Sequence, residues 1–333
     1  MTTNGDKRNA LVTGATGFIG SHIVNELLCR GYSVTCLVRP SNTAKNLQKL
    51  PCRVVTGDLE DLSSLRGLGE PFHEVYHTAG AIKAATRDGF FAVNCKGTRR
   101  LLETIAETCP SLRRFVHISS LAAAGPGSDG NGLTEQETPN PVSWYGESKL
   151  AAEQEAMKFS TVFPVVILRP SAVYGPGDKE TLLIFRMIAR GVFITPGRAA
   201  RHFSLIHVHD LVEAIMRAAT APVASGELIN ISGPEPYRWE DIGRMIAHTL
   251  GRKYRRLALP AWTAGAAGIA GDIRTRITGR PSSINSQKVK ELLSSFWVCD
   301  VEKSRKLLDF SPRIDLEKGI RETAEWYRCN GWL

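Results

Sequence analysis

The stretch Leu11-Val12-Thr13-Gly14-Ala15-Thr16-Gly17-Phe18-Ile19-Gly20 decides the fold of this chain. It joins a short apolar run to a helical pattern over residues 21–30. Gly14 and Gly17 permit a tight turn and close approach of the backbone to a diphosphate, and Gly20 lets the helix pack on the strand. A diphosphate would lie on the free N–H groups at the start of the helix. The stretch therefore predicts a strand, a phosphate-binding turn and a helix.

The same alternation continues along the chain. Short β-branched runs predict strands over residues 10–12, 33–38, 53–56, 74–77, 114–118, 164–169, 204–208 and 227–232. Helical patterns cover residues 21–30, 94–107, 181–190, 209–220 and 314–332. Strands that alternate with helices are typical of a parallel sheet covered on both faces. We therefore expect a doubly wound α/β fold.

The alternation weakens after Pro170, and from Gly233 onward the pattern is mainly helical. We expect a dinucleotide-binding domain over residues 7–170, rejoined by residues 205–232. Residues 171–204 and 233–333 would form a smaller, mainly helical substrate-binding lobe. That lobe would lie over the carboxyl ends of the strands, where open α/β sheets bind ligands.

Composition narrows the class of protein. The 333 residues are 43% hydrophobic and 23% charged, as in ordinary globular proteins. Lys and Arg (42) exceed Asp and Glu (33), but the basic residues are scattered, with no run of five. This pattern favours a phosphate-bearing cofactor over nucleic acid, which we do not expect as a partner.

Compartment and metal content follow from other features. The seven cysteines are widely spaced and form no Cys-x-x-Cys, so we expect neither a metal site nor a disulfide framework. The N-terminus is polar and lacks the pattern of a signal peptide. Residues 257–270 are too short and glycine-rich for a transmembrane helix. We therefore expect a cytoplasmic protein with no integral membrane segment.

Tyr145 and Lys149 carry the chemistry. Four residues is about one helical turn, so both side chains share a helix face. A free tyrosine has a pKa near 10, and a neighbouring ammonium favours the phenolate. Such a pair predicts a proton-transfer site of the kind that hydride transfer to a carbonyl requires, although Tyr-x-x-x-Lys alone arises often by chance.

The glycine stretch, with Tyr-x-x-x-Lys about 130 residues later, resembles the extended short-chain dehydrogenase/reductases. The closest group is the NAD-dependent epimerase/dehydratase family, and the resemblance covers nearly the whole chain. Further segments that match the family are Gly57–Leu59, His77–Gly80, Asn94–Thr98, Leu168–Pro170, Val173–Gly177 and Ile206–Asp210. The resemblance implies a Rossmann-like parallel sheet, a nicotinamide cofactor, a small-molecule substrate and commonly a homodimer.

The resemblance also implies which residues hold the cofactor. They are Gly14, Thr16, Gly17, Phe18, Ile19, Gly20, Arg39, Asp58, Leu59, Thr78, Ala79, Gly80, Ser119, Tyr145, Lys149, Pro170 and Val173. Arg39 follows the second strand, where an acidic residue would bind the ribose 2′-hydroxyl of NAD and an arginine suits a 2′-phosphate. With Ser41 and Lys45 as helpers, Arg39 favours NADP; an exposed arginine at a strand end, with NAD as cofactor, is the alternative.

The implied catalytic residues are Ser120, Tyr145, Lys149 and Asn94. Ser120 aligns better than its rival Ser119 with the family's serine, whose hydroxyl bonds the substrate oxygen while the tyrosine passes the proton. Lys149 would also bind the nicotinamide ribose. Asn94 would anchor a water near Lys149, or serve only as a structural amide.

Other polar residues are weaker candidates. The strand-end histidines His77, His117, His207 and His209 are more often structural than catalytic. Glu135 and Glu137 lie in a loop after Gly127, where surface solvation is expected rather than the acid/base role of a dehydratase.

Two departures from the family pattern bear on the reaction. Sugar-nucleotide enzymes tend to have Asn where Ala172 stands and Arg where Phe203 stands, and both anchor a diphosphate. Their loss, with Arg169-Pro170, resembles the dehydrogenases of sterols, flavonoids and related alcohols. We therefore expect a dehydrogenase or reductase of a hydrophobic alcohol or ketone, with a nucleotide-sugar epimerase or dehydratase as the alternative. The apolar segment 257–269 would line the pocket, rest on a membrane surface or simply pack within the lobe.

Overall fold

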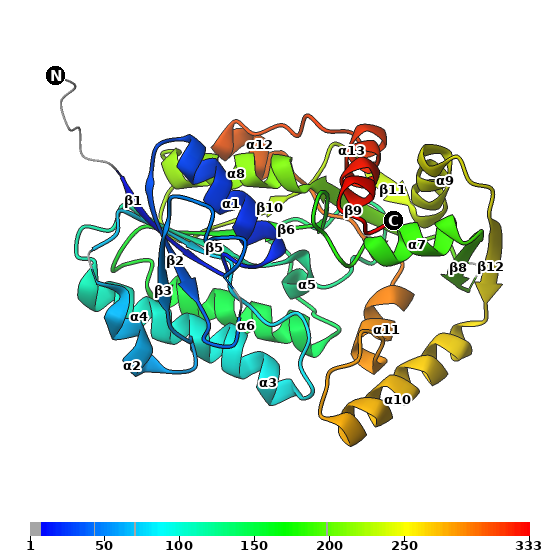
Figure 1. Ribbon diagram of the computed structural model, residues 1–333, viewed down its shortest axis with the longest axis horizontal. Helices are drawn as coiled ribbons and strands as arrows, with labels where there is room; N and C mark the ends of the chain where they lie inside the picture. The colour runs from blue at the N-terminus through cyan, green and yellow to red at the C-terminus, as the bar shows by residue number, and fades with distance from the viewer. Residues whose placement is uncertain (1–7, 43, 70, 198) are drawn as a thin grey trace.

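The computed structural model describes residues 8–42, 44–69, 71–197 and 199–333. Its centre is a seven-stranded sheet of order β10-β6-β5-β4-β1-β2-β3, in which every neighbouring pair is parallel (Figure 1). The strands are β1 (Asn9–Thr13), β2 (Ser33–Val38), β3 (Arg53–Thr56), β4 (Glu74–His77), β5 (Arg114–Ile118), β6 (Val165–Pro170) and β10 (Glu227–Ile231). The chain runs outward from β1 in both directions, so the order reverses between β1 and β4. This is the doubly wound, Rossmann-like sheet that the alternation predicted, with its switch point beside the glycine turn.

Both faces of the sheet are buried, because successive side chains of each strand point to opposite faces. Leu11 and Phe115 belong to one apolar cluster, while Val12 and Val116 belong to the other. The first cluster packs under α2 (Leu62–Leu65), α4 (Thr98–Thr108) and α6 (Trp144–Lys158). The second packs under α1 (Phe18–Cys29), α8 (Val208–Thr220) and α12 (Glu302–Leu308).

A second set of elements lies beyond the carboxyl ends of the strands, on the right in Figure 1. Its helices are α7 (Leu182–Ala189), α9 (Trp239–Leu250), α10 (Ala261–Thr278), α11 (Ser286–Leu293) and α13 (Leu316–Cys329). Its strands are β7 (Ala172–Tyr174), β8 (Val192–Pro196), β9 (His202–His207), β11 (Pro236–Arg238), β12 (Arg255–Leu259) and β13 (Phe296–Trp297). Apart from α10, α11, β12 and β13, these elements share an apolar cluster of their own that includes Phe185, Phe193 and Tyr327.

Of the segment predicted to rejoin the main sheet, β10 does so and β9 does not. β9 pairs with β7, β11 and β13 in a second sheet. The reason is that β7 continues the chain directly past the end of β6 and offers Val173 to Ile206 of β9. The region after Gly233 also contains the short strands β11, β12 and β13, which the helical pattern did not predict.

The expectations about the N-terminus and about membrane spans have different outcomes. Residues 1–7, whose polar sequence argued against a signal peptide, lie outside the described residues. Within the part of the chain that the structure describes, no helix combines the length and the apolar character needed to cross a bilayer.

Candidate active site

Two cavities open at the carboxyl ends of the strands, on either side of the start of α1. The turn cavity, of about 160 Å³, is lined by the glycine turn and the ends of β2, β3 and β4. It contains nine of the predicted cofactor residues: Gly14, Thr16, Gly17, Arg39, Asp58, Leu59, Thr78, Ala79 and Gly80. The tyrosine cavity, of about 270 Å³, contains Ile19, Ser119, Tyr145, Pro170 and Val173 of that prediction, together with Ser120. Phe18, Gly20, Lys149 and Asn94 line neither cavity.

The glycine turn has the geometry of a phosphate cradle. Gly14 has φ of 72°, and a Cβ there would come within 2.6 Å of the Thr78 hydroxyl oxygen. A Cβ on Gly20 would overlap the Gly14 carbonyl. No described side chain caps the start of α1, so its first N–H groups are free to meet an anion. The residues present therefore fit the diphosphate of a dinucleotide.

The far end of the turn cavity carries the positive charge of Arg39. Arg39 is exposed just after β2, and no carboxylate of the described residues lies within ion-pairing distance of it. Beside it, the Asn42 amide donates to the Thr16 hydroxyl at 3.2 Å. Asp58 lies in the same cavity. A free guanidinium at this place suits a phosphate, and the neighbouring polar groups suit a ribose.

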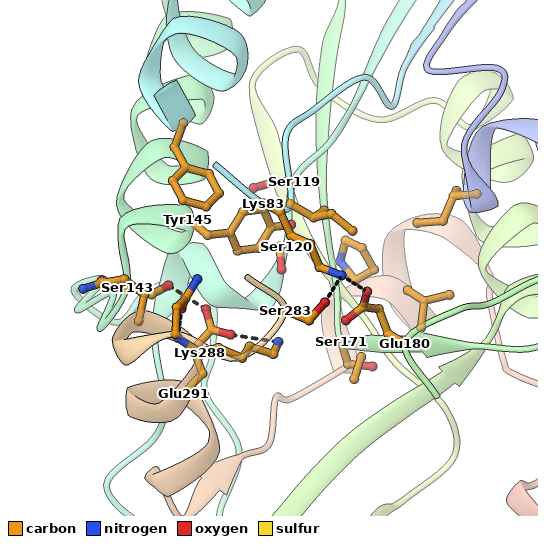
Figure 2. Close-up of a pocket in the computed structure, with 18 of the residues that line it drawn as sticks. Lys83, Ser119, Ser120, Ser143, Tyr145, Ser171, Glu180, Ser283, Lys288 and Glu291 are labelled. Atoms are coloured by element: carbon orange, nitrogen blue, oxygen red, sulfur yellow. Dashed lines mark hydrogen bonds and ion pairs between the residues drawn. The ribbon is translucent and has the colours of Figure 1, made fainter. Parts of the chain in front are cut away.

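Tyr145 stands in the first turn of α6, and its ring points into the tyrosine cavity (Figure 2). The helix starts here because the Ser143 hydroxyl accepts a hydrogen bond from the Gly146 N–H at 3.1 Å. Burial raises the pKa of Tyr145 to about 12, against the lowering effect of a hydrogen bond with Ser120 and with the help of the Glu291 charge. Ser120 is itself held in place as the N-cap of α5 (Leu121–Ala124).

Lys149 lies one turn further along α6, but its ammonium does not meet the Tyr145 hydroxyl. Its Nζ donates to the Ile118 carbonyl at 2.6 Å. Burial lowers the pKa of Lys149 to about 8, against the raising effect of Glu153. In the protein alone, Lys149 therefore does not lower the pKa of Tyr145 as predicted, and burial is the largest effect on that pKa.

The two adjacent serines have different partners. The Ser119 hydroxyl donates to the Glu153 carboxylate, which also accepts two hydrogen bonds from Arg169, at 2.8 and 2.7 Å. All three side chains are buried. Ser119 is thus committed to a buried ion pair, whereas Ser120 faces Tyr145. The sequence analysis missed Glu153, although an acid four residues after Lys149 on the same helix face was a signal for it.

Asn94 is buried in a π-helical turn, Ala92–Gly97, that precedes α4. Its amide oxygen accepts from the Ala81 N–H at 2.7 Å. Its amide nitrogen donates to the Ala81 carbonyl at 3.0 Å and to the Ser148 hydroxyl at 2.8 Å. The two N–H groups of the amide therefore join the loop after β4 to α6. These partners are typical of an asparagine with a structural role.

Charged side chains that the sequence analysis did not single out line the tyrosine cavity. On one wall, Glu291 of α11 accepts from the Ser143 hydroxyl at 2.6 Å and from Lys288 at 3.0 Å. On the opposite wall, Lys83 donates to Glu180 at 2.7 Å and to the Ser283 hydroxyl at 3.2 Å (Figure 2). Apolar groups, among them Ile19, Ile82, Phe90, Ala172 and Val173, complete the lining.

The histidines have structural surroundings. His77 lies between the hydroxyls of Thr13 and Thr98, and burial lowers its pKa to about 3. Burial likewise lowers the pKa of His117 and, to about 3, that of His207. His209 neighbours His207, and neither lines a cavity.

Glu135 is not the solvated residue that its loop position predicted. Its carboxylate accepts from the Asn230 N–H of β10 at 2.7 Å, and partial burial raises its pKa. Glu137 accepts from the N–H of Thr134 at 2.9 Å. Both lie outside the two cavities, so neither is placed as a dehydratase acid or base.

The parallel sheet, the cradle at the switch point and the Tyr-x-x-x-Lys helix beside it define an enzyme of the extended short-chain dehydrogenase/reductase type. The sequence profile of the NAD dependent epimerase/dehydratase family matches residues 10–232, and the chain belongs to that family.

Individual relatives extend over nearly the whole chain. Ceramide reductase from Caulobacter vibrioides (strain NA1000 / CB15N) is 33% identical over 97% of this chain and 95% of its own length. MoeE5, solved in complex with UDP-glucuronic acid and NAD, is 26% identical with a TM-score of 0.77, over 97% of this chain and 99% of that one. The crystal structure of gox2253, at 24% identity, has a TM-score of 0.81 over 98% and 100% of the two chains. The names of the ceramide reductase and of the MoeE5 complex thus point to different substrates on chains similar to this one.

Proposed function

We propose that this enzyme is an NAD(P)-dependent dehydrogenase/reductase that transfers a hydride between the nicotinamide and a secondary alcohol or ketone. The observation that carries the proposal is that Tyr145 and Ser120 line one cavity beside the glycine turn, where Ser120 lowers the pKa of Tyr145 against the effect of burial. The bound nicotinamide supplies or accepts the hydride. The protein's part is to hold the substrate oxygen and to move one proton.

Each residue of the site has a role in that task. The Ser120 hydroxyl holds the substrate oxygen, and Tyr145 gives it a proton during reduction or takes one during oxidation. Lys149, which the Ile118 carbonyl holds one helical turn from Tyr145, would bind the nicotinamide ribose and so fix the cofactor beside the tyrosine. Asn94 does not touch the substrate. It holds α6 against the loop that follows β4, and this contact positions Lys149 on α6.

NADP is the cofactor that we favour. The support is Arg39, which forms no ion pair with the described residues and lies at the end of the turn cavity, where the adenosine ribose of a dinucleotide on the cradle would lie. The wider family is described as NAD dependent. A direct comparison of NADPH with NADH therefore belongs in any assay.

The lining of the tyrosine cavity favours an amphipathic substrate over a wholly apolar sterol. At about 270 Å³ the cavity is small, and serines and charged groups share its wall with apolar side chains. Such a space suits a carbonyl-bearing polar end of a larger molecule whose apolar remainder stays outside. The likeness to a ceramide reductase, a name that denotes a lipid substrate, supports this class.

A nucleotide-sugar epimerase is the second candidate, supported by the likeness to MoeE5 with its bound UDP-sugar and NAD. Two features weigh against it. Ala172 lines the cavity where sugar-nucleotide enzymes tend to place an asparagine. Phe203 packs on Trp239 with ring centroids 5.4 Å apart and lines neither cavity, so it offers no anchor to a diphosphate.

We also infer a division of labour along the chain. Residues 8–170 with 208–232, together with α12, form the dinucleotide-binding domain, and the rest of residues 171–207 and 233–333 form the substrate lobe; the boundary differs from the predicted residue 205 because β9 pairs in the second sheet. Supporting this, the turn cavity is lined only by residues of the first set, whereas α11 of the second set walls the tyrosine cavity.

The test is turnover of NADPH and NADH against long-chain keto-lipids, sterols, flavonoids and UDP-sugars. Tyr145→Phe should lower kcat by at least about a hundredfold, while Tyr254→Phe, outside both cavities, leaves it unchanged. Release of oxidised cofactor with a lipid ketone is the expected result. Isomerisation of a UDP-sugar with retained cofactor would establish the epimerase instead, and full activity of Tyr145→Phe would refute the site.

A further inference from the structure

Helix α10 packs through its smallest residues. Gly268, Gly271 and Thr275 form its buried face, against α11 and the segment before it. A Cβ on Gly268 would come within 3.1 Å of the Ser286 Cα, and one on Gly271 would overlap the Ile284 carbonyl. The close backbone approach explains why small residues occupy this face.

The large apolar residues of α10 lie on the opposite face. Trp262, Ile269, Ile273 and Ile277 are 73%, 60%, 51% and 80% exposed. Their spacing of seven, four and four residues places them on one stripe of the helix. A water-soluble helix normally has the reverse arrangement, and an exposed apolar stripe marks a surface that binds something.

Further exposed apolar residues precede α10. Leu257 and Leu259 of β12, just before the helix, are 44% and 40% exposed. Figure 1 shows α10 at the margin of the molecule, away from the main sheet. We call the exposed side chains of residues 257–280 the α10 face.

Positive charge surrounds the α10 face. Residues 252–290 contain nine Lys and Arg residues and one acidic residue, so they hold eight of the chain's nine net positive charges. Arg274, Arg276 and Arg280 are exposed, and none of them forms an ion pair with the described residues. Long arginine side chains can lie along an apolar surface while their charged ends reach the phosphates of lipid headgroups.

The opposite, glycine face of α10 packs on the wall of the tyrosine cavity. The loop and helix that pack on α10, residues 282–291, supply Ser283, Gln287, Lys288 and Glu291 to the cavity lining.

We propose that the α10 face docks on an anionic lipid membrane. An interfacial helix needs an apolar stripe that enters the acyl boundary and basic residues that meet anionic headgroups, and α10 has both. Trp262 at the start of the stripe is a residue type enriched at that boundary. A second copy of the chain is a poorer occupant, because two faces with this charge would repel each other. Delivery of substrate from the membrane rests on the proposed function, but docking itself does not.

The test is binding of the purified full chain to vesicles, measured by co-sedimentation without cofactor or substrate. Vesicles of phosphatidylglycerol and phosphatidylcholine should bind the protein, and vesicles of phosphatidylcholine alone should bind it at least about tenfold more weakly. Binding should fall with added salt. The tryptophan emission should shift to shorter wavelength on binding, and Trp262→Phe should remove most of that shift.

Matched variants separate this face from overall charge. Arg274→Glu with Arg276→Glu should weaken binding at least about tenfold, whereas Arg305→Glu with Arg321→Glu, exposed on α12 and α13, changes charge equally and should weaken it less than about threefold. Ile273→Ser with Ile277→Ser should also weaken binding, while Val162→Ser, exposed before β6, should not.

Three results would overturn the proposal. They are absence of binding to anionic vesicles, equal loss in both charge variants, and a dimer that Ile273→Ser dissociates. Because no turnover is measured, failure of docking would leave the proposed reductase activity standing, and inactivity toward lipids would leave docking standing.

Discussion

Replacement of Glu153 by glutamine should destabilise the fold more than its small chemical change implies. The carboxylate accepts three hydrogen bonds, from Ser119 and from two nitrogens of Arg169, in a pair whose side chains are 4% and 2% exposed. In the glutamine, an NH2 group replaces one carboxylate oxygen and would face the hydrogen-bond donors of Arg169 or Ser119. The Arg169 charge would also remain buried without a counter-charge. Breaking such a pair costs about 3 kcal/mol, which raises the unfolded fraction more than a hundredfold.

Urea unfolding followed by tryptophan fluorescence and circular dichroism measures this effect. The midpoint should fall while the slope stays unchanged. The control is Glu155→Gln, which breaks the ion pair with the exposed Lys158 and should cost less than about 1 kcal/mol. Adding Arg169→Met to Glu153→Gln should restore part of the loss, since no unpaired charge then remains. A Glu153→Gln protein within about 1 kcal/mol of the wild type would refute the argument.

Three further outcomes test the site itself. Ser120→Ala should lower kcat by at least about a hundredfold, whereas Ser119→Ala should lower kcat less than about tenfold and mainly reduce the free energy of unfolding. Turnover and urea unfolding of both variants measure these effects, and the opposite order of kcat would make Ser119 the catalytic serine. Because the Glu291 charge raises the pKa of Tyr145, Glu291→Gln should lower that pKa and move the rising limb of alcohol oxidation to lower pH; a pH profile of kcat/KM that stays in place or moves upward contradicts this. Arg39→Ser should raise KM for NADPH at least about tenfold and change KM for NADH less than about threefold; equal effects on both cofactors would remove the case for NADP.

Much of the fold could be predicted because its signals are local. The predicted strands 33–38, 53–56, 74–77 and 114–118 have the bounds of β2 to β5, since each is a short apolar run between polar turns. The place of β9 could not be predicted in this way. Its sequence resembles a core strand, and only the continuation of β6 into β7 provides the partner that draws it into the second sheet.

The roles of the site residues were harder to predict from the sequence than the fold was. Two adjacent serines look alike in a motif, and the choice between their roles depends on Glu153, which is distant along the chain. Glu291 came into view only through the packing of α11 on the start of α6. The basic residues around α10 were visible in the sequence, but a search for consecutive charges missed them because the fold gathers them from a wider segment.

The place of β10 at the edge of the main sheet has a consequence for synthesis on the ribosome. A nascent chain that has emerged only as far as β6 already holds every residue of the turn cavity, yet the outer edge of β6 has no partner. That edge stays open while the segment with β7, α7, β8 and β9 is made, and it closes only when β10 arrives. An unpaired parallel edge is a site of mispairing, so a chaperone that shields β6 during this interval would raise the yield of folded enzyme.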